Sequence, residues 1–178
     1  MIRTVLLATA ALAVTVTAAS AQHAPTRRKV VESVTIRAPA DKVWAVVGNP
    51  ADATWIAHVV KAERVTDATK PTYRLTLDNG HTLVEESRKL DPEARSFAYY
   101  LVRNDVADLP ANDYSATLSV VPEGDGAARV EWKAAFYRGY PNNDPPPALN
   151  DENSEKAVRA WIHASLETLK ARLEKGGS

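Results

Sequence analysis

The hydrophobic residues change their spacing along the chain, and each spacing predicts a different element. Residues 30–37 alternate between apolar and polar side chains, which is the period of a β-strand. The apolar residues of segment 40–47 recur at helical spacing after a proline and before a glycine, which predicts a short helix. A second helical turn is expected over residues 51–56.

Beyond residue 59 the alternation returns and predicts six further strands. They cover residues 60–66, 72–77, 81–90, 95–102, 113–121 and 130–136. Asp78-Asn79-Gly80 is the strongest turn signal between them. Because no glycine or proline interrupts the strand interiors, these strands suit central positions in an antiparallel sheet.

Residues 151–175 predict one long amphipathic helix, which ends before Gly176. Its apolar residues, three or four positions apart, are Val158, Ile162, Leu166, Leu169 and Leu173. The element order predicts an α+β domain in which a curved antiparallel sheet of about seven strands wraps around this last helix, because both apolar surfaces must be covered. Such an arrangement leaves room for an interior cavity between sheet and helix.

The start of the chain has the pattern of a secretory signal peptide. Arg3 precedes an uncharged run that closes in Ala19-Ser20-Ala21, with small residues before the expected cleavage site. Its densest apolar part is short for a membrane span, which needs about 20 residues. We therefore expect a signal peptide over residues 1–21, a flexible leader over 22–29 and a single domain over 30–175. The mature protein is expected to be periplasmic, with no membrane span.

Charge and cysteine content exclude several classes of function. Lys and Arg number 22 and Asp and Glu also number 22, a balance that does not favour nucleic-acid binding. The absence of cysteine excludes disulfides, thiolate metal ligands and thiol nucleophiles. The four histidines show no metal-ligand spacing, and neither a serine elbow nor a glycine-rich phosphate loop is present. We predict no catalytic residues, no metal site and no cofactor.

One motif connects the chain to a known superfamily. Ile36-Arg-Ala-Pro-Ala-Asp-Lys-Val-Trp44, followed by Asn49-Pro50 and Trp55, resembles the opening of START-like proteins. This superfamily, also called SRPBCC or the polyketide cyclase/dehydrase and lipid-transport family, has the Bet v 1-like helix-grip fold. The resemblance covers residues 30–173 and implies that fold. Because the superfamily holds ligand carriers, cyclases and chaperone cofactors, it implies function less closely.

Three further segments resemble the MxaD-like branch, periplasmic START-like proteins of bacterial methanol-oxidation systems. They are Glu85-Glu86, Asn112-Asp-Tyr-Ser-Ala-Thr-Leu118 and Phe136-Tyr-Arg-Gly-Tyr-Pro-Asn-Asn-Asp-Pro-Pro-Pro147. The resemblance implies a non-enzymatic accessory role, with a periplasmic dehydrogenase (methanol dehydrogenase) or its cytochrome c acceptor as partner. One departure from the branch is that Ile56-Ala57 separate Trp55 from His58, where a Trp-His-Pro-like sequence is expected.

The proline-rich segment 137–150 allows two interpretations. It is a stiff spacer into the last helix, or a preformed recognition loop, because proline fixes φ and lowers the entropy cost of ordering. As a recognition loop it would expose side chains suited to a protein partner. These are Arg138, Tyr140, Asn142, Asn143 and Asp144. We expect Phe136 to point inward and part of the loop between Tyr140 and Asp144 to face solvent.

The alternative function is a carrier, or a cyclase-type enzyme, for a small apolar ligand held between sheet and helix. The candidate cavity residues are Trp55, His58, Glu85, Tyr114, Trp132, Phe136 and Trp161. Aromatic residues of this kind also simply fill cores. Adjacent strand residues face opposite sides, so one of Glu85 and Glu86 enters the cavity. There it is either a general acid or base, or the partner of an arginine such as Arg74, Arg88 or Arg95.

Overall fold

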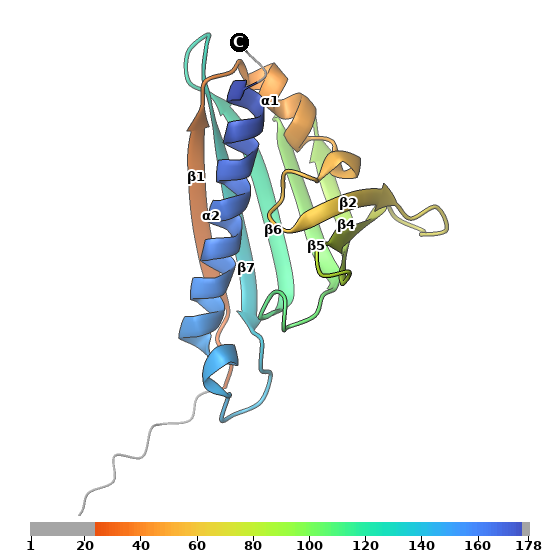
Figure 1. Ribbon diagram of the computed structural model, residues 1–178, viewed down its shortest axis with the longest axis vertical. Helices are drawn as coiled ribbons and strands as arrows, with labels where there is room; N and C mark the ends of the chain where they lie inside the picture. The colour runs from red at the N-terminus through yellow and green to blue at the C-terminus, as the bar shows by residue number, and fades with distance from the viewer. Residues whose placement is uncertain (1–23, 176–178) are drawn as a thin grey trace, which may run out of the picture.

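The computed structural model describes residues 24–175 and has the predicted helix-grip architecture. Its elements are β1 (Arg28–Ile36), α1 (Ala40–Val47), the 3₁₀ turn η1 (Pro50–Asp52), β2 (Val59–Arg64), β3 (Thr72–Leu77), β4 (Thr82–Asp91), β5 (Ser96–Arg103), β6 (Ala111–Pro122), β7 (Ala128–Arg138), the 3₁₀ turn η2 (Pro147–Leu149) and α2 (Asp151–Lys175). The strands form one antiparallel sheet in the order β1-β7-β6-β5-β4-β3-β2, shown in Figure 1. The predicted fold class is therefore confirmed.

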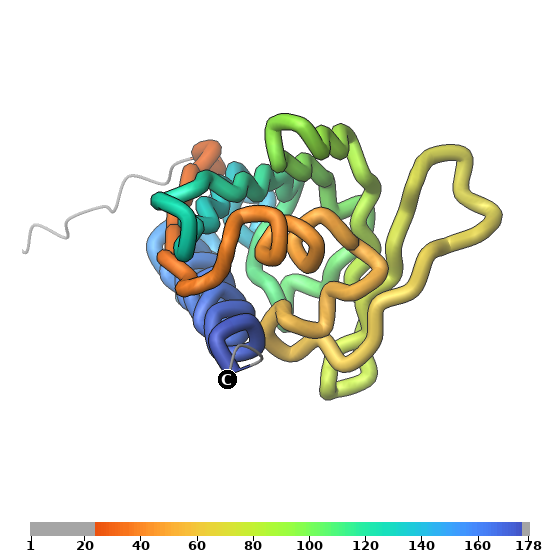
Figure 2. Tube along the Cα trace, turned by 90° about the horizontal axis from the view of Figure 1, so that it is seen from above, coloured from red at the N-terminus to blue at the C-terminus, as the bar shows by residue number. Residues whose placement is uncertain are grey.

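The long helix α2 lies along β1 and β7, and the rest of the sheet curves away from it (Figures 1 and 2). Its buried face consists of the apolar residues that the sequence predicted, together with two serines. They are Ser154, Val158, Ile162, Ser165, Leu166, Leu169 and Leu173.

 The predicted amphipathic pattern of the helix is confirmed, with Leu169 and its neighbours in the helical stripe packed against the sheet.

Two boundaries differ from the sequence prediction. The second helical turn is the 3₁₀ turn η1, which is shorter than residues 51–56 and is followed by bends and turns. Strand β1 begins at Arg28, inside the segment expected to be a leader. Arg27 pairs with Asp113 at 2.8 Å and Arg28 pairs with Glu155, so both basic residues tie the start of the strand to the domain.

The described residues contain no helix that is long and apolar enough to cross a membrane. The predicted signal peptide, residues 1–21, lies outside the described part of the chain.

The core lies between the concave face of the sheet and α2. Alternation along β7 places Val130, Trp132, Ala134 and Phe136 on this face, and all four are buried. Phe136 therefore points inward, as expected. Trp132, Tyr114 and Phe136 are the largest of the fully buried side chains, so aromatic rings occupy the centre of the grip.

Candidate ligand site

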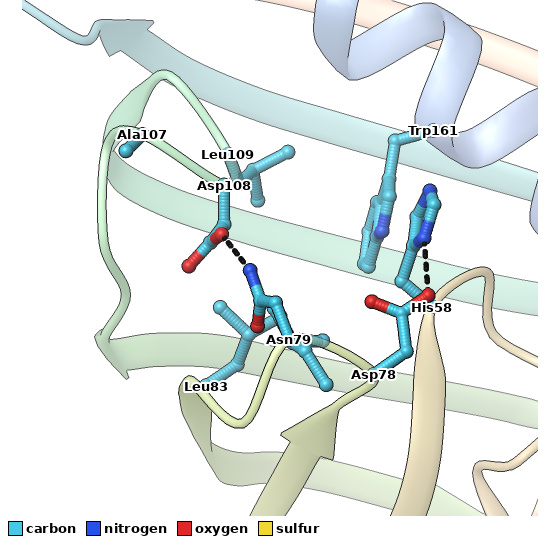
Figure 3. Close-up of a pocket in the computed structure, with 9 residues that line it drawn as sticks. His58, Asp78, Asn79, Leu83, Ala107, Asp108, Leu109 and Trp161 are labelled. Carbon is cyan, nitrogen blue, oxygen red and sulfur yellow. Dashed lines mark hydrogen bonds and ion pairs between the residues drawn. The ribbon is translucent and has the colours of Figure 1, made fainter.

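A pocket of about 290 Å³ opens between the β3–β4 turn, the β5–β6 loop and α2. Its apolar walls are formed by Leu83, Leu109 and Trp161 (Figure 3). Its polar rim is formed by His58 and Asp108. His58 and Trp161, two of the predicted cavity residues, both line this opening. A pocket that combines apolar walls with polar groups at its rim suits a small organic ligand.

Hydrogen bonds hold the rim of this pocket together. Asn79 donates from Nδ2 to Asp108 Oδ1 at 2.6 Å, and His81 Nδ1 lies 2.7 Å from Asp108 Oδ2. On the other side, His58 Nδ1 lies 2.9 Å from Asp78 Oδ2. Asp108 therefore links the β3–β4 turn to the β5–β6 loop across the mouth, and we name the Asn79–His81–Asp108 contacts the latch.

The inner wall of the pocket continues into an aromatic cluster. The ring of Trp161 meets that of Trp132 edge to face, with centroids 5.5 Å apart. Trp132 in turn lies 5.7 Å from Trp55 and 6.5 Å from Tyr99, again edge to face. Trp161 therefore separates the open pocket from the buried rings.

Glu85 enters this interior from β4 and is 2 % exposed, whereas Glu86 faces outward. Glu86 pairs with Lys70 and Arg88, each at 3.0 Å. No ion pair joins Glu85 to a cation within residues 24–175. This face of the sheet therefore carries an isolated buried carboxyl group.

The prediction that an arginine forms an ion pair with the inward-facing glutamate was wrong. The three candidates pair elsewhere: Arg74 with Glu63, Arg88 with Glu86, and Arg95 with Asp41. Arg74 of β3 and Arg88 of β4 are exposed or partly exposed strand residues whose partners lie on the surface, and Arg95 lies in the β4–β5 turn, where its partner belongs to α1.

Burial raises the pKa of Glu85 to about 8. At neutral pH the side chain is therefore mainly an uncharged carboxylic acid, which donates a hydrogen bond as well as accepting one. Burial is also the largest cause that raises the pKa of Tyr99 and of Tyr114. The interior consequently holds titratable groups in their neutral forms.

Three buried polar atoms lie near Glu85 without a hydrogen-bond partner among the described residues. They are the hydroxyls of Tyr99 and Tyr114 and Nε1 of Trp132. The Tyr99 and Tyr114 hydroxyls lie close enough to each other and to the Trp132 N–H for these contacts to affect the pKa of both tyrosines. A void of about 10 Å³, the size of one water molecule, adjoins Glu85 and Tyr99.

The seven predicted cavity residues thus fall into three groups. His58 and Trp161 line the open pocket. Glu85, Tyr114 and Trp132 belong to the buried polar cluster. Trp55 and Phe136 pack in the core, where Trp55 also borders the small void and Phe136 stacks on Tyr114 with centroids 6.1 Å apart.

The sequence reasoning missed Tyr99, although a signal for it was present. Strand β5 alternates through Phe97, Tyr99 and Leu101, and all three are buried. The same alternation also identifies the neighbouring Tyr100 as the half-exposed one, which contacts Arg88 on the outer face.

The expectation that Arg138 is exposed was wrong. Arg138 is 2 % exposed and donates to Asp151 Oδ2 at 2.8 Å, to the Tyr140 carbonyl at 2.9 Å and to the Asn142 carbonyl at 2.7 Å. The reason is the alternation of side chains along a strand. Arg138 lies two residues after the inward-facing Phe136 and therefore faces the same side of the sheet.

The remaining loop residues differ in exposure. Tyr140 is half-buried, while Asn142, Asn143 and Asp144 are exposed. Asp144 adopts a positive φ of 57°, which marks a tight turn at the tip. Part of the loop therefore faces solvent, as expected, and the buried Arg138 holds it against the start of α2.

One group of described side chains has ligand atoms close enough to hold a metal ion. His81, Asp105 and Asp108 each offer an atom within 4.8 Å of the others, at the outer edge of the latch. The sequence analysis did not find this group because its members come from two separate turns. Two of its three members are exposed, and His81 already contacts Asp108.

Comparison with known proteins identifies the family. The model for polyketide cyclase / dehydrase and lipid transport proteins matches residues 27–174. The chain belongs to this family. A comparison with curated proteins gave no match.

Several solved structures share the fold at low sequence identity. A putative uncharacterized protein from Bacillus thuringiensis has a TM-score of 0.69 and 19 % identity, over 82 % of this chain and 98 % of that one. Norcoclaurine synthase from Thalictrum flavum, in complex with dopamine and hydroxybenzaldehyde, has a TM-score of 0.61 and 17 % identity, over 87 % and 91 % of the two chains. The Zhui aromatase/cyclase from Streptomyces sp. R1128 has a TM-score of 0.61 and 20 % identity, over 84 % and 95 %. These likenesses concern the fold.

Proposed function

We propose that this protein binds a small, mostly apolar molecule between its sheet and α2, and that the molecule enters through the latched pocket. The observation that carries the proposal is the pocket of about 290 Å³ whose inner wall, Trp161, rests on the buried ring of Trp132. Enzymes and carriers share this fold, so the proposal concerns binding and assigns no reaction.

Entry to the interior requires a movement at the mouth. The void beside Glu85 holds only about 10 Å³, which is too small for an organic ligand. Trp161 is half-buried and forms the boundary between the pocket and the inner rings. A ligand that displaces this side chain, or that parts the latch between Asn79 and Asp108, would join the pocket to the interior.

Blocking the mouth tests this proposal. Ala107 is exposed and lines the pocket, so Ala107→Trp should fill the opening without disturbing the core. We expect Nile red, a neutral apolar dye, to bind the wild type saturably with a blue-shifted emission, and Ala107→Trp to weaken binding at least tenfold. Fluorescence titration measures both affinities.

Ala171→Trp is the matched control, because Ala171 is an exposed residue of α2 that does not line the pocket. It should bind the dye as the wild type does. Equal weakening by both tryptophans, or dye binding that does not saturate, would argue against a ligand site at this mouth.

A second candidate function is the accessory role implied by the MxaD-like sequence segments. What supports it is the loop of residues 137–150, where Arg138 anchors two carbonyls and leaves Asn143 and Asp144 exposed on a fixed tip. The proposed partner is a periplasmic dehydrogenase, with methanol dehydrogenase as the specific case, or its cytochrome c.

The loop tip offers a direct test of this second candidate. We expect the immobilised mature protein to retain methanol dehydrogenase, another periplasmic dehydrogenase or a cytochrome c from periplasmic extract of its host, and Asn143→Lys/Asp144→Lys to lose it. Mass spectrometry identifies what is retained. Recovery of the same redox protein by the variant would show that the tip is not the contact surface.

The proposed compartment has its own test. Intact mass of the protein recovered from its host should correspond to a chain that begins at Gln22, because Ala19 and Ala21 are the small residues expected before the cleavage point. A protein recovered with residues 1–21 attached would contradict export with cleavage.

A further inference from the structure

Three side chains at the outer edge of the latch form a group of metal-ligand types. His81 ends the β3–β4 turn, whereas Asp105 and Asp108 belong to the β5–β6 loop. Each offers one ligand atom, and these atoms all lie within 4.8 Å of one another. The sequence prediction of no metal site rested on spacing along the chain, and the fold brings this group together from two separate segments.

Hydrogen bonds fix the orientation of both carboxylates. Asn79 Nδ2 donates to Asp108 Oδ1 at 2.6 Å, and the Ala107 N–H donates to Asp105 Oδ1 at 2.9 Å. The second oxygen of Asp108 lies 2.7 Å from His81 Nδ1, and the second oxygen of Asp105 has no hydrogen-bond partner within residues 24–175. Ligating carboxylates in metal sites are held by hydrogen bonds of this kind, which leave an oxygen for the ion.

The charges of the group are not balanced by the chain. Asp105 forms no ion pair within the described part of the chain, and Asp108 pairs only with His81. Arg103 borders the same surface hollow as His81 and Asp105, yet it forms no ion pair with either carboxylate. Two carboxylates held close together repel each other. A bound divalent cation would offset this repulsion, which the single histidine contact leaves in place.

The ligand types select the class of metal. An imidazole nitrogen with two carboxylate oxygens suits Zn²⁺, whereas Ca²⁺ and Mg²⁺ prefer oxygen ligands alone. Zn²⁺ binds such atoms at about 2.0–2.2 Å, so the three ligand atoms need to close only slightly around an ion. His81 and Asp105 are exposed and can make this adjustment. The hollow beside them, of about 570 Å³, leaves room for water as the fourth ligand.

We propose that this protein binds one Zn²⁺ ion through His81, Asp105 and Asp108, and that the ion fastens the β3–β4 turn to the β5–β6 loop. Asp108 also lines the mouth pocket, so the ion strengthens the latch at that mouth. The site lies outside the interior and needs no ligand there. The inference is therefore independent of the proposed function.

Calorimetric titration of Zn²⁺ into the full mature protein, purified without an affinity tag and treated with a chelator, tests the site. At pH 7.5 we expect one ion per chain with a dissociation constant in the micromolar range. Loss of a residue that only supports a metal ligand costs roughly tenfold to a hundredfold in affinity. Asp105→Asn and His81→Gln remove ligands themselves, so each should weaken binding by at least about tenfold.

His58→Asn is the matched control. It removes the histidine of the other His–Asp pair at the mouth, in which His58 Nδ1 lies 2.9 Å from Asp78 Oδ2, and asparagine tolerates the positive φ of 65° at this position. The variant should bind Zn²⁺ as the wild type does. Zn²⁺ should raise the melting temperature of the wild type and of His58→Asn, and should not raise that of Asp105→Asn, because a ligand of the folded state stabilises it.

Each contrary result overturns a stated part of the inference. If the wild type bound no Zn²⁺ at millimolar concentration, the group would be an ion-paired latch and nothing more. Equal affinities of Asp105→Asn and the wild type, or equal weakening by His58→Asn and His81→Gln, would rule out the three-residue site. Binding that left the melting temperature of the wild type unchanged would rule out the fastening of the two segments. Dye binding at the mouth enters none of these measurements, so the proposed function stands or fails separately.

Discussion

Raising the pH from 5 to 9 is expected to destabilise the protein strongly, and Glu85→Gln is expected to remove most of that loss. Burial moves the pKa of Glu85 from 4.5 to about 8. Between these two values the folded protein keeps a proton that the unfolded chain has released, so the free energy of unfolding falls as the pH rises. The contribution of the neutral carboxyl is complete below pH 4.5 and is lost by the time the pH passes about 8.

The size of this effect follows from the shift. One pKa unit corresponds to about 1.4 kcal/mol, so the full shift amounts to about 5 kcal/mol as an order of magnitude, of which about 4 kcal/mol is lost between pH 5 and pH 9. Urea unfolding at pH 5, 7 and 9 measures it. The acidic residues whose pKa is lowered, such as Asp52 beside Arg172 and Glu155 beside Arg28, titrate below this window.

Glu86→Gln is the matched control for this prediction. Glu86 is the adjacent residue, faces outward and pairs with Lys70 and Arg88, so its replacement should leave the pH dependence close to that of the wild type. If Glu85→Gln lost stability with rising pH as steeply as the wild type does, the buried carboxyl would not be the group that titrates.

The alternation of side chains along β-strands explains how much of the fold and of the candidate site the sequence could predict. The alternating pattern located all seven strands, and the helical stripe of α2 identified its buried face. The same alternation also places residues of the candidate site. Leu83 and Glu85 share one face of β4, and Phe136 and Arg138 share one face of β7. Strict use of the alternation would therefore have predicted both the inward-facing Glu85 and the buried Arg138.

Other features of the site depend on contacts between distant segments. The absence of a cation near Glu85 in the described chain follows from which strands are neighbours, and no pattern within β4 encodes it. The mouth pocket likewise depends on two turns that meet through Asn79 and Asp108. His58, at its rim, has a positive φ of 65°, a backbone conformation that its apolar neighbours in the sequence do not predict.

Arg138→Met is expected to lower the free energy of unfolding by about 3 kcal/mol, because breaking a buried ion pair leaves the remaining groups without compensation. The side chain of Arg138 is 3 % exposed and that of Asp151 is 25 % exposed, so the cost should lie at the lower end for such pairs. The Tyr140 and Asn142 carbonyls would lose the same donor. Urea unfolding of the variant and the wild type measures the difference.

Two further variants decide between an anchor and a surface residue. Asn143→Ala changes an exposed residue of the same loop and should leave stability within about 0.5 kcal/mol of the wild type. Arg138→Met/Asp151→Asn should be less destabilised than the sum of its single changes, since the two side chains form one pair. If Arg138→Met left the melting temperature unchanged, Arg138 would not stabilise the loop and would again be a candidate residue for binding a partner. The expected loss instead makes Arg138 the residue that fixes the loop, and leaves recognition to the exposed tip at Asn143 and Asp144.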